Sequence, residues 1–357
     1  MEIKKQRNSS IELLRIIAML FIVLSHLCVH NGIAMSEMPI SVNKIFVQWG
    51  TLGNLGVDIF VIISGYFIST KDFSRKRLID LLTQVWFYSI LLAVVCIFAF
   101  HVTVGTKDII KVVLPTIFAE YWFFTAYIVL LLISPFINIL IKNLERASFA
   151  KLLFILVGLW VVIPTFTKQS MYGGELAQFV LLYLIGAYFR KYPDNCFSKR
   201  KVRSWCTALC WVLLLLSVIC IDLLSSKLGG ALNAYRGYFF SRHSLLIVGI
   251  AVGMFAIAVY RKPFTSKLIN TVSSCVFGVY LIHDNPLVRK IIWTRIFPIS
   301  QIYDSSLFIL YAAGIVITVF LVCAAVEFVR SKTVAMPISN AVDRVVRWAE
   351  RKLLKGK

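Results

Sequence analysis

A histidine and an arginine interrupt the first long apolar stretch of the sequence. Arg15 and His26 are eleven residues apart. At about 100° per residue this spacing returns them to within about 20° of one face of a helix, ~16 Å apart along its axis. Glu12 lies one turn before Arg15, and His30 lies one turn after His26. Polar groups within a long apolar helix are costly, so we expect this stripe to serve function or to pair inside the protein.

A carboxylate lies in the second apolar stretch, which would cross a membrane in the opposite direction. Asp58 is near the beginning of this stretch, at a depth similar to that of His26. The matched depth predicts a contact between His26 and Asp58. Such a carboxylate would select one tautomer of the imidazole and raise its basicity, as a general base requires. The alternative is that Asp58 caps a helix or pairs with an arginine elsewhere.

A basic cluster follows the second apolar stretch. Ser64-Gly65-Tyr66 brings small residues to the end of the stretch, where helices could approach closely. The cluster itself consists of Lys71, Arg75, Lys76 and Arg77. Cations at this density could bind phosphate groups. The alternative is a simple anchor at the cytoplasmic surface.

Three further side chains lie at predicted outer helix ends. Tyr121 and Trp122 suit an interfacial aromatic belt, and they could equally stack on a sugar ring. His283 ends another apolar stretch and is a further candidate substrate-binding residue. No histidine belongs to a metal-binding pattern such as HExxH, and the His26/His30 pair has no acidic or cysteine partner nearby in sequence. We therefore predict no metal site.

The composition indicates which elements must hold these residues. Hydrophobic residues make up 59% of the 357 positions and charged residues 15%, and the mean hydropathy is +0.82. A soluble chain would carry roughly 25% charged residues. The apolar residues occur in blocks of about 20, the length that crosses a hydrocarbon layer. The sequence therefore predicts an all-α polytopic membrane protein. Most of its eight cysteines lie inside apolar blocks and are expected to be buried free thiols rather than a disulfide framework.

The apolar blocks predict about ten transmembrane helices. They cover Ile11–His30, Leu52–Ser69, Thr83–Phe100, Tyr121–Ile141, Ala150–Phe166, Glu175–Phe189, Arg203–Leu224, Arg242–Tyr260, Leu268–His283 and Ser306–Val329. The first is expected to remain as an uncleaved span, because no small-residue cleavage site follows it. The segment Val113–Phe118 is too short to span and is expected to be re-entrant or interfacial.

The basic residues predict the orientation of these helices. With the N-terminus in the cytoplasm, 27 of the 38 Lys and Arg residues fall in inner connections and tails and 10 in outer connections. This bias predicts that both termini are cytoplasmic. The net charge of +21 thus serves orientation and contact with membrane lipids, and no nucleic-acid partner is expected.

The C-terminal segment has a different character from the rest of the chain. From Ile338, apolar residues recur at helical spacing while Arg344, Arg347 and Arg351 occupy the remaining face. This pattern predicts an amphipathic helix on the cytoplasmic leaflet, with a disordered basic tail as the alternative. The predicted domains are therefore a transmembrane domain over residues 1–334 and a basic amphipathic cytoplasmic tail over 335–357.

Several segments resemble the integral-membrane acyltransferase-3 family of bacterial O-acyltransferases. The first is 10–26, in which an acid and an arginine are followed by ten residues and a histidine. The second is 56–68, from Gly56-Val57-Asp58 to Ser64-Gly65-Tyr66. Further likeness lies in 121–128 and 278–283. The similarity covers nearly the whole chain, and it is to the stand-alone type without an outer esterase-like domain.

The resemblance implies a multi-pass enzyme of the bacterial plasma membrane. It would move an acetyl or similar acyl group from cytoplasmic acetyl-CoA to a hydroxyl of a cell-surface or lipid-linked glycan. By analogy His26 would be the catalytic base, Arg15 its essential partner, and the basic cluster would contact the phosphates of CoA. The alternative that the residues leave open is a transporter or flippase for a glycolipid or small solute, although no paired repeat of broken helices is present.

Overall fold

The computed structural model describes residues 7–33, 40–169 and 173–355, and all regular secondary structure in these ranges is helical. The all-α prediction is confirmed. The helices are α1 (Ser9–His30), α2 (Val42–Gly50), α3 (Gly53–Ile68), α4 (Arg75–Phe100), α5 (Thr106–Val113), α6 (Trp122–Asn143), α7 (Arg146–Val157), α8 (Ile163–Thr167), α9 (Glu175–Lys191), α10 (Arg200–Lys227), α11 (Leu245–Val259), α12 (Lys267–His283), α13 (Pro286–Lys290), α14 (Phe308–Thr333) and α15 (Ala335–Lys355).

Eight helical segments of the described chain are long and apolar enough to cross a membrane. One combines α2 with α3, and another combines α7 with α8 through a turn of π-helix at Gly158–Val162. The other two predicted spans are present as α9 and α12, which are shorter, with 17 residues each. The chain is therefore a polytopic membrane protein, and ten crossings with both termini on the cytoplasmic side stay a prediction.

The short helices α2 and α5 were not expected from the apolar pattern. α2 precedes α3 and begins at the Ser41 side chain, which accepts a hydrogen bond from the Lys44 backbone N–H. α5 covers Thr106–Val113, and turns rather than a re-entrant helix carry the chain on to Tyr121. α5 lies between spans, and α2 leads directly into α3 within one span. In both places the apolar pattern is too short for sequence periodicity to reveal a separate helix.

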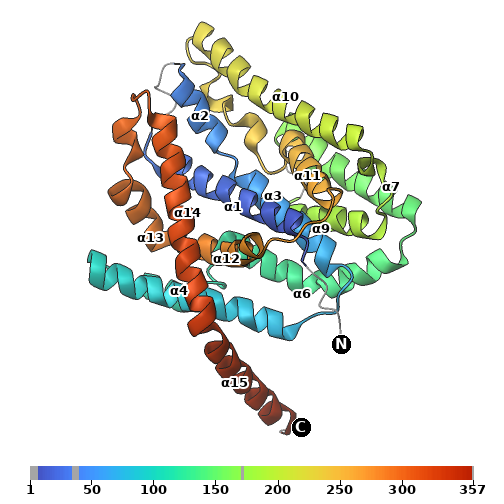
Figure 1. The fold of residues 1–357 in the computed structure, drawn as a ribbon, viewed down its shortest axis with the longest axis vertical. Helices are drawn as coiled ribbons and strands as arrows, with labels where there is room; N and C mark the ends of the chain where they lie inside the picture. Colours follow the sequence, from blue (N-terminus) through green and yellow to red (C-terminus); the bar gives the residue numbers. More distant parts are fainter. Residues whose placement is uncertain (1–6, 34–39, 170–172, 356–357) are drawn as a thin grey trace.

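The interior of the bundle is built around α1, α3 and α12. In Figure 1, α1 runs through the centre, while α10 and α4 lie along opposite edges of the bundle. α3 packs against α1, α9 and α11, and α12 packs against α1 and α14. The largest buried side chains include Tyr88, Phe124, Phe179 and Phe255. We call the end of the bundle where α1 begins the inner end and the opposite one the outer end.

The contact between α3 and α9 is a backbone-to-backbone approach. A Cβ atom on Gly65 would lie 2.1 Å from the carbonyl oxygen of Tyr183, and one on Gly186 would lie 2.1 Å from that of Ile62. Each helix thus supplies a glycine where the other brings its main chain close. This contact explains the small residues at the end of the second apolar stretch.

The C-terminal segment forms α15, which confirms that it is helical. The helix begins at Ala335, three residues before the predicted start, and follows α14 almost directly. It leaves the bundle and passes beside the first turns of α4 (Figure 1). Ser339 donates a hydrogen bond to Asp80, and Asp343 lies 3.8 Å from Arg75. Placement of α15 on the membrane surface stays a prediction.

Candidate active site

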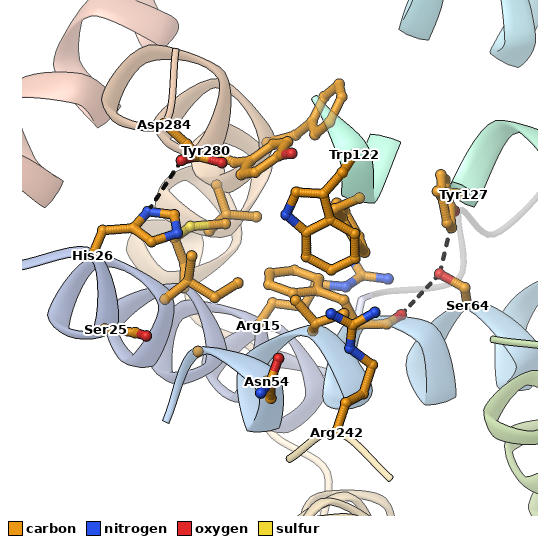
Figure 2. Close-up of a pocket in the computed structure, with 18 of the residues that line it drawn as sticks. Arg15, Ser25, His26, Asn54, Ser64, Trp122, Tyr127, Arg242, Tyr280 and Asp284 are labelled. Carbon is orange, nitrogen blue, oxygen red and sulfur yellow. Dashed lines mark hydrogen bonds and ion pairs between the residues drawn. The ribbon is translucent and has the colours of Figure 1, made fainter. Parts of the chain in front are cut away.

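A cavity of about 1150 Å³ passes through the centre of the bundle. Arg7, Arg15 and Arg77 line it toward the inner end, and His26 and Asp284 line it toward the outer end. Figure 2 shows His26 and Asp284 on one side of the pocket, Ser64 and Tyr127 on the other, and Arg15 and Trp122 between them. The predicted stripe on α1 therefore faces a shared interior space rather than lipid.

Arg15 is held in this cavity by an acidic neighbour. Its guanidinium lies 2.9 Å from the Glu12 carboxylate, one turn earlier, and also approaches the ring of Phe67 at 5.6 Å. Ser273 on α12 donates a 2.6 Å hydrogen bond to the same carboxylate. Glu12 is buried, whereas the Arg15 side chain keeps 28% of its surface exposed. The pair thus places an oriented, accessible cation on the cavity wall.

A second polar group lies on the opposite wall. The hydroxyl of Tyr127 on α6 is 3.2 Å from the Ser64 hydroxyl on α3. The Arg77 guanidinium donates to the same tyrosine at 3.2 Å. Phe123 stacks on the Tyr127 ring at 5.9 Å. This contact brings Arg77, from the first turn of α4, to the inner part of the cavity.

A chain of hydrogen bonds defines the protonation of His26. The Nδ1 of His283 lies 2.5 Å from the carbonyl oxygen of Val279, which can only accept, so Nδ1 carries the proton. The Nε2 of neutral His283 must then accept, and it lies 3.0 Å from the Nδ1 of His26. His26 therefore donates through Nδ1. Its remaining nitrogen, Nε2, keeps a lone pair, and within the described chain no hydrogen bond occupies it.

An acidic and a basic residue complete the outer end of the site. Asp284 Oδ1 is 3.6 Å from the Nδ1 of His26 and 3.3 Å from the guanidinium of Arg289 (the first of these contacts is drawn in Figure 2). The ring of His30 lies 5.5 Å from that of His26. A carboxylate at this position would stabilise a protonated His26 electrostatically.

His26, His30 and Asp284 are also the residues that could bind a metal ion, although the sequence predicts no metal site. Donor atoms of His26, His30 and Asp284 all lie within 4.8 Å of one another, an arrangement in which a cation could bind. The fold thus supplies the acidic partner that the neighbouring sequence lacks. The Nδ1 of His26 is already hydrogen-bonded to His283, so His26 would offer its Nε2 to such a cation. The absence of a metal stays a prediction.

The predicted contact between His26 and Asp58 is not formed. Asp58 is fully buried, and neither of its carboxylate oxygens has a hydrogen-bond partner among the described residues. Its electrostatic partner is Arg242, which precedes α11. Asp58 does not line the cavity that His26 faces, because the rotation of α3 buries its carboxylate away from that space. The alternative that Asp58 pairs with an arginine elsewhere is the one that agrees with the structure.

The four residues of the basic cluster are not equivalent. Only Arg77 lines the cavity. Lys71 is exposed in the turn before α4, Arg75 lies near Asp343 of α15, and Lys76 lies 3.7 Å from Asp80. The cavity instead gathers cations that the cluster does not contain, Arg7 and Arg15.

The three predicted substrate-binding residues differ in whether they line the cavity. Trp122 lines the cavity and lies under the guanidinium of Arg242 at 4.2 Å. Tyr121 points away from the cavity and is buried, because its hydroxyl donates to the carbonyl of Leu281 and accepts from Asn285. His283 is fully buried behind His26. Tyr121 and His283 therefore support the site from behind rather than lining it.

Sequence reasoning missed Asp284, Arg242 and Arg289 as site residues. Asp284 follows His283 directly at the outer end of a predicted span, so its depth matched that of His26. Arg242 and Arg289 are basic residues in connections predicted to lie outside, where the positive-inside rule expects few. The position of Asp284 and the unusual charge of the outer connections were both visible in the sequence. Neither feature shows which helices lie side by side.

Comparison with known proteins identifies the family of the chain. A family model described as an acyltransferase domain, of the acyltransferase-3 type, matches residues 8–327. No curated protein and no solved structure matches the chain. The matched region runs from the residue before α1 into the last turns of α14 and so includes the entire cavity apart from Arg7. The chain therefore belongs to the acyltransferase-3 family and is a membrane acyltransferase.

Proposed function

We propose that this acyltransferase transfers an acetyl group from acetyl-CoA at the inner end of the cavity to a glycan hydroxyl at its outer end, with His26 as the general base. The observation that carries the proposal is the cavity itself. One continuous space is lined by Arg7, Arg15 and Arg77 at one end and by His26 at the other. This arrangement suits a polyanionic donor on one side and a hydroxyl acceptor on the other. The match to the acyltransferase family over residues 8–327 favours an enzyme over a transporter, and the proposal places this enzyme in a bacterial plasma membrane.

The inner end supplies the features that the donor requires. Coenzyme A carries several phosphate charges, and guanidinium groups bind phosphate by paired charge-assisted hydrogen bonds. Arg77 and Arg7 would hold these phosphates near the cytoplasmic surface. The uncharged pantetheine arm would extend past Arg15 toward His26. Arg15 and His26 are ~16 Å apart along the axis of α1.

The reaction follows from the protonation state of His26. Its Nε2 accepts the proton of the acceptor hydroxyl while the oxygen attacks the thioester carbonyl carbon. The tetrahedral intermediate then breaks its C–S bond, and the CoA thiolate recovers the proton from His26. The products are an acetyl ester and free CoA thiol. While His26 is protonated, Asp284 stabilises its positive charge and His283 keeps the ring in place.

A sided transport assay tests the proposal directly. Purified protein is reconstituted into sealed vesicles, with radiolabelled acetyl-CoA on one side and a glycan acceptor confined to the other. Label appearing in the acceptor, with release of CoA thiol on the donor side, is the expected result. Movement of unmodified acceptor without acetylation would instead identify a transporter and overturn the proposal.

Arg77 is expected to matter more for the donor than the rest of the basic cluster. The Arg77→Gln variant removes a guanidinium from the cavity wall and should raise the KM for acetyl-CoA by about 10- to 100-fold, the equivalent of one charge-assisted hydrogen bond. Lys71→Gln is the matched control, since Lys71 lies outside the cavity. Equal effects of the two substitutions would mean that the cluster acts through overall charge and not through Arg77.

His283 is expected to act through His26. The His283→Leu variant removes the acceptor that holds the Nδ1 proton of His26, and kcat should fall by about 10- to 100-fold while the KM for acetyl-CoA stays unchanged. His283→Gln offers a carbonyl oxygen to the same proton and should recover part of the loss. If both variants lose activity equally, or if the KM for acetyl-CoA changes instead of kcat, His283 has only a packing role.

A further inference from the structure

Two arginines line the outer part of the cavity, beyond the residues assigned to the donor. Arg289, at the end of α13, lies beside Asp284, and Arg242 lies across the cavity over the ring of Trp122. They come from two different connections of the chain. Both lie at the end where the acceptor would enter under the proposed function, and neither is required to activate its hydroxyl.

The two connections are unusual in their charge. The stretch 227–242 contains three Lys or Arg residues and no acid, and the stretch 284–295 contains three with Asp284 as the sole acid. Outer connections of membrane proteins are normally poor in Lys and Arg. An excess of positive charge here therefore calls for a reason other than orientation.

Arg242 and Arg289 differ in how many of their N–H donors remain available to a ligand. Arg242 is paired with Glu175, lies close to the charge of Asp58 and is largely buried. Arg289 meets Asp284 through one nitrogen at 3.3 Å, and its side chain is 36% exposed. A guanidinium has five donors, so Arg289 retains most of its donors for a ligand in the cavity. Asp284 in turn holds this guanidinium within reach of a group bound beside His26.

We infer that the acceptor glycan carries a negative charge, a phosphate or a carboxylate, which Arg289 binds while His26 activates a neighbouring hydroxyl. The inference rests on the proposed function and specifies its acceptor class. Arg242 adds positive potential across the cavity and orients Trp122. A phosphate-bearing lipid headgroup from the outer leaflet has the same chemistry and is separated from the glycan by the experiment below.

The test compares two disaccharides that differ in charge. Equilibrium binding of cellobiose and cellobiouronic acid is measured on purified protein in a neutral detergent, and CoA release with each sugar is followed separately. We expect the acidic sugar to bind at least about tenfold more tightly than the neutral one. Arg289→Gln should remove this difference, and Arg289→Lys should keep most of it. Lys290→Gln is the matched control, because this neighbouring cation is exposed and outside the cavity.

The outcomes separate this inference from the function on which it rests. Equal binding of the two sugars, or equal effects of Arg289→Gln and Lys290→Gln, overturns the charged acceptor even where CoA release continues. Binding that depends on charge and on Arg289, without CoA release from any sugar, supports the charged ligand and overturns acetyl transfer. If Arg289→Gln weakens binding of phosphatidylglycerol but not of cellobiouronic acid, the site serves a lipid headgroup and the inference fails.

Discussion

The His26→Gln variant is expected to lose acyl transfer by about 10²- to 10⁴-fold, the usual contribution of a general base. Glutamine keeps a polar side chain that can meet the Nε2 of His283, but it cannot accept a proton from a hydroxyl. The loss should appear in kcat and in CoA release with any acceptor. Binding of acetyl-CoA, measured by equilibrium titration, should change little, because the donor phosphates lie at the other end of the cavity.

His101→Asn is the matched control for this substitution. His101 is exposed beyond the end of α4, has a left-handed backbone (φ 51°) that asparagine adopts readily, and lies outside the cavity. Its activity should equal that of the unmodified protein. Both variants should elute as single species of the same size from detergent gel filtration. A His26→Gln protein that retains more than about a tenth of the activity would remove His26 from the role of general base.

The Gly65→Ala variant is expected to destabilise the bundle strongly. The added methyl would lie 2.1 Å from the carbonyl oxygen of Tyr183 and 2.7 Å from its Cα, both of them main-chain atoms that a rotamer change does not move. α3 and α9 would have to separate. Overpacking of this kind costs typically about 1–3 kcal/mol. Thermal unfolding in detergent should show a lower Tm, and activity should also fall because the adjacent Ser64 lines the cavity.

Gly314→Ala provides the control for this effect. Gly314 lies within α14, and a Cβ atom there would meet nothing within 4 Å. Alanine favours a helix over glycine by about 1 kcal/mol, so Tm should stay the same or rise slightly. If Gly65→Ala unfolds at the same temperature as Gly314→Ala, the close approach of α3 to α9 does not contribute to stability.

The parts of the site that lie within one helix could be predicted from the sequence. Arg15 and His26 share a face because eleven residues make just over three turns, whatever the rest of the chain does. The cost of polar groups in lipid then indicates that this face points inward. The structure agrees, since both residues line the cavity. The family match over residues 8–327 confirms the resemblance on which the function rested.

Contacts between helices could not be predicted in the same way. The sequence predicts similar depths for Asp58 and Asp284, but Asp284 is the one that approaches His26, because α12 packs beside α1 with the required rotation. The adjacent residues Tyr121 and Trp122 were equally good candidates for substrate binding by sequence. The first supports α12 through hydrogen bonds, while the second lines the cavity. In the basic cluster, Arg77 reaches the cavity because Tyr127 on α6 lies opposite.

The sequence by itself determined the membrane environment, the helical architecture and the polar face of α1, because apolar length and helical periodicity are properties of short stretches of chain. Only the tertiary structure decided which carboxylate faces His26, that His283 stands behind it, and that Arg289 and Arg242 lie at the outer end of the cavity. These relations depend on how each helix is rotated and shifted against its neighbours. Close packing determines these rotations and shifts, as in the contact of Gly65 with the main chain of α9. Each such contact depends on residues that are far apart in the chain.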